Sequence, residues 1–177
     1  MKFEKVSYEQ YLKDCISLFG DWDIDLIKKS YDDLKLPKRA TSGSAGYDFF
    51  YQFNNTTLKC GETLYMPTGI KVELDNKRDD QFGYFLAIVP RSGLGFKYRL
   101  QLDNTIGIID ADYYNNTNNE GHIMAKLTND GKEGKDILFE NGKAYMQGII
   151  TLYSLTDDDE TSTIRSGGIG STDRNNT

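Results

Sequence analysis

The feature that most constrains the fold is a change in hydrophobic period after Pro37. From there on, aromatic and β-branched residues gather in short runs, and Gly, Asn and Asp clusters separate them. The runs are residues 47–53, 63–74, 82–89, 122–127 and 144–153. A period of two at this spacing predicts the short strands of a β barrel or sandwich. With 177 residues, of which 38% are hydrophobic, the chain can bury the core of one domain.

The segment before Pro37 has a helical period instead. Apolar residues recur at i, i+3, i+4, i+7, i+8 and i+11 from Tyr8, which predicts a helix over residues 8–19. Ser7 is placed as its N-cap, with Gln10 completing a capping box, and Gly20 ends the run. A second short helix or turn is expected before Pro37. Residues 1–33 are therefore predicted to form an N-terminal helical extension that packs on the β domain without chemistry of its own.

Composition excludes several classes of protein. The chain has 21 Lys and Arg against 27 Asp and Glu, a formal charge of −6, which argues against non-specific binding to duplex nucleic acid. No apolar run approaches the ~20 residues of a membrane span, and no secretion signal is recognisable, so we expect a cytoplasmic protein that does not enter membranes. The same acidity also argues, at first sight, against a polyphosphate ligand.

Histidine and cysteine are too scarce for several kinds of site. Cys15, Cys60 and His122 are the only residues of these types, too few for a disulfide framework or a Cys/His zinc site. A Ser-His-Asp or Cys-His enzyme would have to use His122, and no Gly-x-Ser-x-Gly nucleophile elbow accompanies it.

Two loop-like segments present groups suited to phosphate or to a metal-bound water. Residues 40–48 are small residues that end in Asp48 at the start of a strand. Residues 90–95 place Arg91, Ser92 and Gly93 directly after a strand, and this combination of guanidinium, hydroxyl and backbone N–H groups suits phosphate oxygens. Each segment alone is also compatible with an ordinary turn.

Two further segments carry carboxylates and glycines. Residues 104–113 are predicted to form a hairpin whose apolar arm ends in Asp110 and Asp112, on opposite faces if the strand continues, with Tyr113 as a stacking wall. Residues 165–172 form a glycine-rich arm with Arg165, either a disordered linker or a lid over phosphates.

In order and spacing these segments resemble the five motifs of the homotrimeric dUTPase family. The motifs are Ala-Gly-Tyr-Asp at 45–48, Pro-Arg-Ser-Gly at 90–93, Gly-x-Ile-Asp-x-Asp-Tyr at 107–113, Gly-x-x-x-x-Gln at 142–147 and Arg-x-Gly-Gly-x-Gly-Ser-Thr at 165–172. The N-terminal extension is similar to those of members from Gram-positive bacteria or their phages. The resemblance implies a jelly-roll-like β-clip barrel over residues 34–156. It also implies hydrolysis of dUTP to dUMP and pyrophosphate with Mg²⁺, at three sites between the subunits of a trimer.

The resemblance also implies a role for each motif residue. Asp110 would be the general base for the attacking water, and Asp48 would hold metal-bound waters. The phosphates would be contacted by Arg91, Ser92, Gly93 and Gln147. The deoxyuridine would be bound by Asn104, Gly107, Ile109 and Tyr113. An arm over residues 157–177 would close a neighbouring site through Arg165, Gly168, Ile169, Gly170 and Ser171.

The chain departs from the family pattern at two places that matter for the site. Ile169 replaces the Phe that stacks on uracil, so a less populated closed arm is expected. Asn115 replaces a Gly and opens a polar insertion to Gly121, which reshapes the mouth of the pocket.

Three alternatives remain open from the sequence. One is a dCTP deaminase-like enzyme of the same fold. Another is a phage-type dUTPase that also binds a regulatory protein, through the insertion or the N-terminal helix. The last is a jelly-roll binding module without catalysis.

Overall fold

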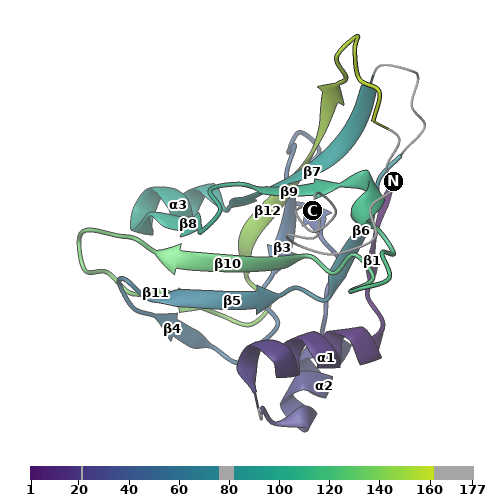
Figure 1. The fold of residues 1–177 in the computed structure, drawn as a ribbon. Coiled ribbons are helices and arrows are strands. Elements are labelled where there is room, and N and C mark those ends of the chain that lie inside the picture. The colour runs from purple at the N-terminus through teal and green to yellow at the C-terminus, as the bar shows by residue number, and fades with distance from the viewer. Residues whose placement is uncertain (21, 76–81, 162–177) are drawn as a thin grey trace, which may run out of the picture.

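The strands of the protein lie in antiparallel sheets, with the two N-terminal helices at one end (Figure 1). The computed structural model describes residues 1–20, 22–75 and 82–161. A five-stranded sheet has the order β2 (Lys38–Arg39), β3 (Tyr47–Phe50), β12 (Ala144–Ser154), β7 (Phe82–Pro90), β9 (Gly107–Asp110). A three-stranded sheet has the order β5 (Thr63–Pro67), β10 (Met124–Asn129), β8 (Leu100–Leu102). Two pairs complete the set: β1 (Lys2–Lys5) with β6 (Ile70–Glu73), and β4 (Thr56–Leu58) with β11 (Ile137–Phe139). The expected all-β fold is confirmed, and its described sheets form a clip rather than one closed barrel.

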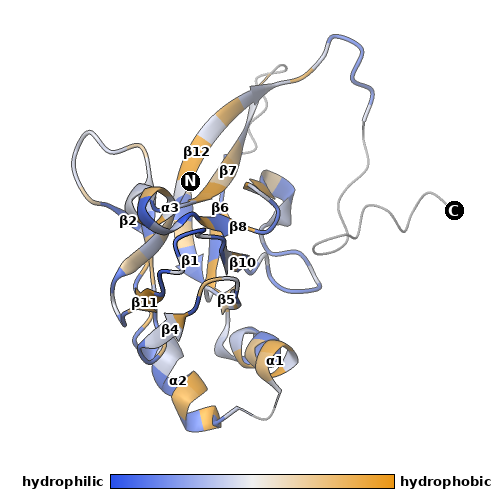
Figure 2. Cartoon of the chain, turned by 90° about the vertical axis from the view of Figure 1, so that its left-hand side faces the viewer, coloured by the Kyte–Doolittle hydropathy of each residue, from blue (hydrophilic) through white to orange (hydrophobic). Residues whose placement is uncertain are grey.

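The longest of the described strand pairings joins β7 and β12. Its pairs run from Pro90 opposite Met146 to Phe82 opposite Ser154, and its far end rises away from the other strands (Figure 1). Both strands carry many hydrophobic residues, and in β7 the run from Phe85 to Val89 is unbroken (Figure 2). Leu86, Ile88 and Met146 are buried in the core, because successive side chains of a strand point to opposite faces.

The first helix begins and ends where the sequence predicts. α1 spans Tyr8–Phe19, and its N-cap Ser7 accepts a hydrogen bond from the N–H of Gln10 at 3.1 Å. The other half of the predicted capping box is wrong: the Gln10 side chain donates to Asp14, and the N–H of Ser7 donates to Glu120. The helix is thus capped from a loop more than a hundred residues away.

The N-terminal segment contributes more than helices. α2 spans Ile24–Asp32, and β1, which the sequence did not predict, pairs with β6. Tyr11, Cys15 and Ile27 are fully buried in the same hydrophobic core as the strands. Burial raises the pKa of the Cys15 thiol to about 12. The extension is therefore part of the core rather than a surface addition.

One predicted run divides into two strands, and one predicted hairpin does not form. The run at 63–74 is two strands, divided at Thr68 and Gly69. Residues 104–113 are not a hairpin, because β8 pairs with β10 whereas β9 pairs with β7, and only a single bridge joins Leu102 to Thr105. The segment instead crosses from one sheet to another. None of the described helices has both the length and the apolar character needed to cross a membrane.

Candidate active site

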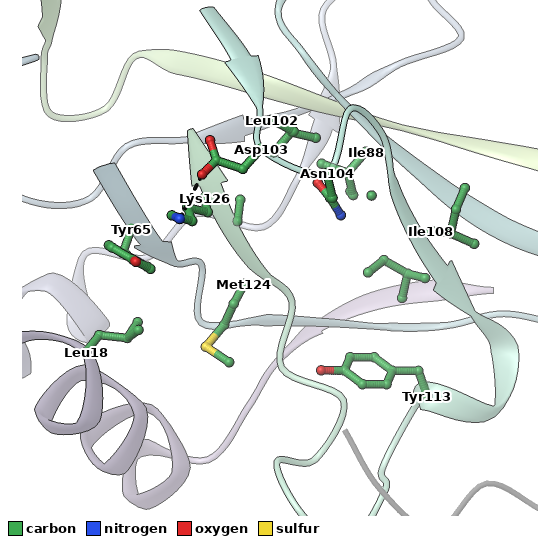
Figure 3. A pocket seen from close by; sticks show the side chains of 13 residues that line it. Leu18, Tyr65, Ile88, Leu102, Asp103, Asn104, Ile108, Tyr113, Met124 and Lys126 are labelled. Atoms are coloured by element: carbon green, nitrogen blue, oxygen red, sulfur yellow. Dashed lines mark ion pairs between the residues drawn. The ribbon is translucent and has the colours of Figure 1, made fainter. Parts of the chain in front are cut away.

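A pocket of about 500 Å³ opens where the chain crosses between the two larger sheets (Figure 3). The predicted nucleoside-binding residues all line it: Asn104, Gly107, Ile109 and Tyr113. Asn104 lies in the turn between β8 and β9, and Tyr113 closes the pocket from the far end of β9. These four residues therefore share one cavity.

The other wall comes from residues that the sequence analysis did not select. Leu18 of α1, Tyr65 of β5 and Met124 of β10 face Tyr113 across the pocket (Figure 3). At its rim Lys126 pairs with Asp103 at 2.9 Å, and the hydrogen bond to Asp103 raises the pKa of Lys126. Leu18 falls outside the apolar helical pattern and the others lie on strands far apart in the sequence, so no local signal could have identified them.

The carboxylate predicted to be catalytic lies beside this pocket. Asp110 is the last residue of β9 and follows the pocket-lining Ile109. The strand does not continue: residues Ala111–Tyr113 form the 3₁₀ helix η1. The prediction that Asp110 and Asp112 lie on opposite faces depended on a continuing strand, and it therefore does not apply. The turn of η1 carries Tyr113 inward, where it is 3% exposed.

A polar cluster of Asp48, Arg91 and Gln147 lies toward the opposite edge of the five-stranded sheet. Asp48 of β3 pairs in register with Gln147 of β12, and the Asp48 carboxylate lies 3.7 Å from the guanidinium of Arg91. Gly46 makes room for the amide, because a Cβ there would lie 2.2 Å from the Oε1 of Gln147. Three of the family-like motifs are thus brought together by strand pairing.

The Pro-Arg-Ser-Gly segment ends in a helix that the sequence did not predict. Arg91 is the N-cap of α3 (Ser92–Tyr98), and Ser92 and Gly93 form its exposed first turn. The first N–H groups of a helix have no partner within it. Ser92 and Gly93 therefore present donors beside Arg91, as the sequence analysis expected of a phosphate-binding segment.

Asp110 and this polar cluster are far apart within one chain. β3 and β9 are separated by β12 and β7, and three strand spacings amount to about 14 Å. Through the ladder, Asp48 aligns with Val89, whereas Asp110 aligns with Phe85, an offset of about 13 Å along the strand. Asp48 and Asp110 are therefore about 20 Å apart, farther than the triphosphate of a single nucleotide reaches.

The histidine and cysteines play no part in either group. His122 is fully buried; its Nε2 accepts from the N–H of Gly69 at 2.7 Å, and its Nδ1 lies 2.6 Å from Asp14. Because Nε2 is the acceptor, the proton is on Nδ1 and is shared with Asp14. Cys15 is buried and Cys60 lies on the surface. His122 thus ties α1 to the core, and the described residues hold no histidine-based catalytic arrangement.

Some sequence predictions cannot be placed. Arg165, Gly168, Ile169, Gly170 and Ser171, and with them the greater part of the predicted arm, lie outside the described residues. Among residues 1–20, 22–75 and 82–161, no three His, Cys, Asp or Glu side chains gather as a metal site would require. A single carboxylate such as Asp48 is compatible with Mg²⁺, because this ion keeps several waters and binds through one or two carboxylates and substrate phosphates.

A β-clip with a largely apolar pocket and a separate cluster of donors suited to phosphate indicates a nucleotide hydrolase. The family model for dUTPase matches residues 32–172, and the chain belongs to the dUTPase family. It is a dUTP diphosphatase, a hydrolase that acts on dUTP.

Relatives and solved structures agree with this family. The deoxyuridine 5′-triphosphate nucleotidohydrolase of Lactococcus lactis is 36% identical over 141 residues, covering 78% of this chain and 88% of its own. The crystal structure of the dUTPase from Streptococcus mutans is 31% identical, with a TM-score of 0.60, and the match covers 89% of this chain and 99% of that one.

A more distant neighbour resembles the chain in fold only. A mutant dUTPase from phage phi11 of S. aureus is 18% identical, with a TM-score of 0.54 and coverage of 76% of this chain and 92% of its own, and it coordinates a structural Mg(II) ion.

Proposed function

We propose that the chain hydrolyses dUTP to dUMP and pyrophosphate in active sites that are each completed by a neighbouring subunit of a homotrimer. The observation that carries this proposal is the separation of about 20 Å between Asp110 and Asp48. One chain holds both halves of the site, yet it cannot bring them to one substrate. Rotational symmetry resolves this conflict by placing the polar cluster of one subunit against the pocket of the next.

The pocket side would bind the nucleoside and supply the base. The amide of Asn104 and the backbone of Gly107 and Ile109 would read the polar edge of uracil, because an incorrect base leaves buried polar groups unpaired. Tyr113 would lie beneath the deoxyribose, where a 2′-hydroxyl has no room. Asp110 would orient the attacking water and accept its proton, since positioning and charge stabilisation carry most of phosphoryl-transfer catalysis.

The polar cluster of the neighbouring subunit would hold the triphosphate. The Arg91 guanidinium, the Ser92 hydroxyl, the N–H of Gly93 and the Gln147 amide are all donors suited to phosphate oxygens. Asp48 would accept hydrogen bonds from waters of a bound Mg²⁺. That ion, when present, neutralises phosphate charge.

The arm would close this site. Arg165, Gly168, Gly170 and Ser171 would contribute donors to the phosphates, and Ile169 would cover the base without stacking on it. A regulatory protein partner is also a prediction. Such a partner would contact the exposed side chains of the insertion from Asn115 to Gly121.

Mixed trimers test the proposal. Asp110→Asn and Arg91→Ala damage opposite halves of a shared site, so at dUTP concentrations well below KM each variant alone should be nearly inactive. Trimers refolded from an equal mixture should regain about a quarter of wild-type activity, because a quarter of randomly paired sites receive two intact halves. Refolded single variants are the control.

Substrate choice provides a second readout in the same experiment. Pyrophosphate release from dUTP, with no ammonia released from dCTP, is the expected result. Absence of any recovery in the mixture, with each variant confirmed as a trimer by light scattering, would contradict the shared site.

A further inference from the structure

The insertion from Asn115 to Gly121, which departs from the family pattern, is folded inward by its own asparagines. The Oδ1 of Asn116 accepts from the N–H groups of Asn118 and Asn119, at 3.0 and 3.1 Å. Its Nδ2 donates to the carbonyl of Tyr113 and to the Oδ1 of Asn119, both at 2.8 Å. Asn116 and Asn119 are buried, and a buried amide whose hydrogen bonds are all satisfied fixes the backbone around it.

Asn119 connects this folded loop to the pocket. Its Nδ2 donates to the hydroxyl of Tyr113 at 2.7 Å and to the carbonyl of His122 at 3.4 Å. Its Oδ1 accepts from the N–H of Gly121 at 3.2 Å as well as from Asn116. The Tyr113 hydroxyl in turn donates to the carbonyl of His122 at 3.1 Å. The phenol is therefore held at its tip from two directions, which prevents the ring from tilting within the pocket wall.

The loop has a backbone shape that requires glycine at position 121. Gly121 has φ of +81°, and a Cβ there would lie 2.6 Å from the carbonyl oxygen of Tyr113. The N–H of Asn115 donates to the carbonyl of Glu120 at 3.0 Å, which closes the base of the loop. The insertion is thus packed directly against the backbone that carries Tyr113.

The N-terminal extension anchors the same loop. The Glu120 carboxylate accepts from the N–H and the hydroxyl of Ser7, at 2.9 and 2.6 Å, and lies 3.5 Å from the ammonium of Lys71. Ser7 is the N-cap of α1, whose Leu18 lines the opposite wall of the pocket. Helix, loop and pocket wall are therefore linked through a continuous set of hydrogen bonds.

We propose that Asn119 is a positioning residue for sugar selection: by holding the Tyr113 hydroxyl it keeps the ring where a ribose 2′-hydroxyl cannot be accommodated. The inference rests on the proposed function in one respect, the placement of Tyr113 beneath the deoxyribose. A ring freed at its tip yields to an extra hydroxyl, so the rejection of UTP weakens while the catalytic groups remain. The insertion then contributes to the selection of deoxyribose over ribose.

The test measures kcat/KM for dUTP and for UTP and compares their ratio. Asn119→Ala should lower the ratio by about tenfold, mainly by raising the value for UTP. Tyr113→Phe, which removes the hydroxyl but keeps the ring, should lower it to a similar extent. In the Tyr113→Phe background the added Asn119→Ala change should alter the ratio by less than about twofold, because the bond between the two is already absent. Asn118→Ala, in the exposed part of the same loop, is the matched control and should leave the ratio unchanged.

The outcomes separate this inference from the proposed function. A folded Asn119→Ala trimer with a wild-type ratio overturns the positioning role, and so does Tyr113→Phe with a wild-type ratio if Asn119→Ala fails to fold. A general loss of stability lowers the unfolding midpoint and the activity on both substrates but leaves their ratio intact, which also counts against the inference. If Tyr113→Ala leaves the ratio unchanged, it is the placement of Tyr113 in the proposed function that fails.

Discussion

The two halves of the proposed site differ in how completely a single chain builds them. The pocket half is concave, its Tyr113 is 3% exposed, and buried amides brace it from behind. The phosphate half is open: the Arg91 side chain is 49% exposed, and the Asp48 carboxylate is 3.7 Å away.

The difference shows which half is already ordered before substrate binds. Groups already fixed in the free protein lose little freedom when substrate arrives, whereas a long exposed side chain must be ordered by the ligand. The nucleoside half should therefore control chemistry and discrimination, and the phosphate half affinity. Substitutions in each half test this contrast.

Removing the base should have the largest effect. Asp110→Asn keeps the shape of the side chain but cannot accept the water proton, so kcat should fall by about 10³-fold. Binding should change little, because the pocket remains intact. Pyrophosphate release and nucleotide titration by calorimetry measure the two quantities, and retained turnover would remove Asp110 from its role.

Removing the exposed cation should act on affinity instead. Arg91→Ala deletes a charge-assisted hydrogen bond to phosphate, worth about 2 kcal/mol, so KM for dUTP should rise by about thirtyfold. Lys97→Ala, an exposed cation of the same helix α3, is the control and should leave KM unchanged. If Arg91→Ala lowered kcat alone, the division between the halves would be wrong.

The histidine behind the pocket should matter for stability only. His122→Ala removes the partner of the Gly69 N–H and of the Asp14 carboxylate, which should cost about 2 kcal/mol in the free energy of unfolding. Urea unfolding measures this loss. The kcat of the folded trimer should stay within about twofold of wild type, and a fall of several hundredfold would mean that His122 takes part in the chemistry.

The smallest effect is expected at the anchor of the insertion. Burial acts to raise the pKa of Glu120, but the hydrogen bonds from Ser7 and the charge of Lys71 outweigh it, so the pKa is lowered. A lowered carboxyl pKa contributes stability that is present above the ordinary pKa and is lost as the pH falls through the value in the folded protein.

Glu120→Gln should therefore cost less than about 1 kcal/mol at pH 7. The difference from wild type should shrink as the pH falls below about 4. Urea midpoints measured from pH 7 to pH 3 provide the check. A difference that grows in acid would contradict the anchor.

Local signals in the sequence predicted the limits of the first helix. The α1 helix starts and ends where its period, its Ser7 cap and Gly20 place it, because a helix satisfies its backbone within itself. The pocket residues of one motif were also predictable, since a short segment keeps them together. Helix α3 was missed because Gly93 and Gly95 lie inside it, and glycine disfavours helix interiors.

Contacts between distant segments were not predictable from the pattern. The pairing of β8 with β10 and of β9 with β7 replaces the expected hairpin, and nothing in residues 104–113 encodes those partners. The Glu120 cap of α1 and the Leu18 wall of the pocket depend on the same kind of long-range packing. The family resemblance supplied the roles of single residues, but only the strand order shows how far apart Asp48 and Asp110 lie.

That distance gives the enzyme a dependence on its own concentration. A dissociated subunit would keep every catalytic group and still contain no complete site, so dilution below the dissociation constant of the assembly should abolish turnover rather than reduce it in proportion. Specific activity per chain would rise with the square of subunit concentration in that regime, and the nucleotide, by bridging two subunits, would itself favour assembly.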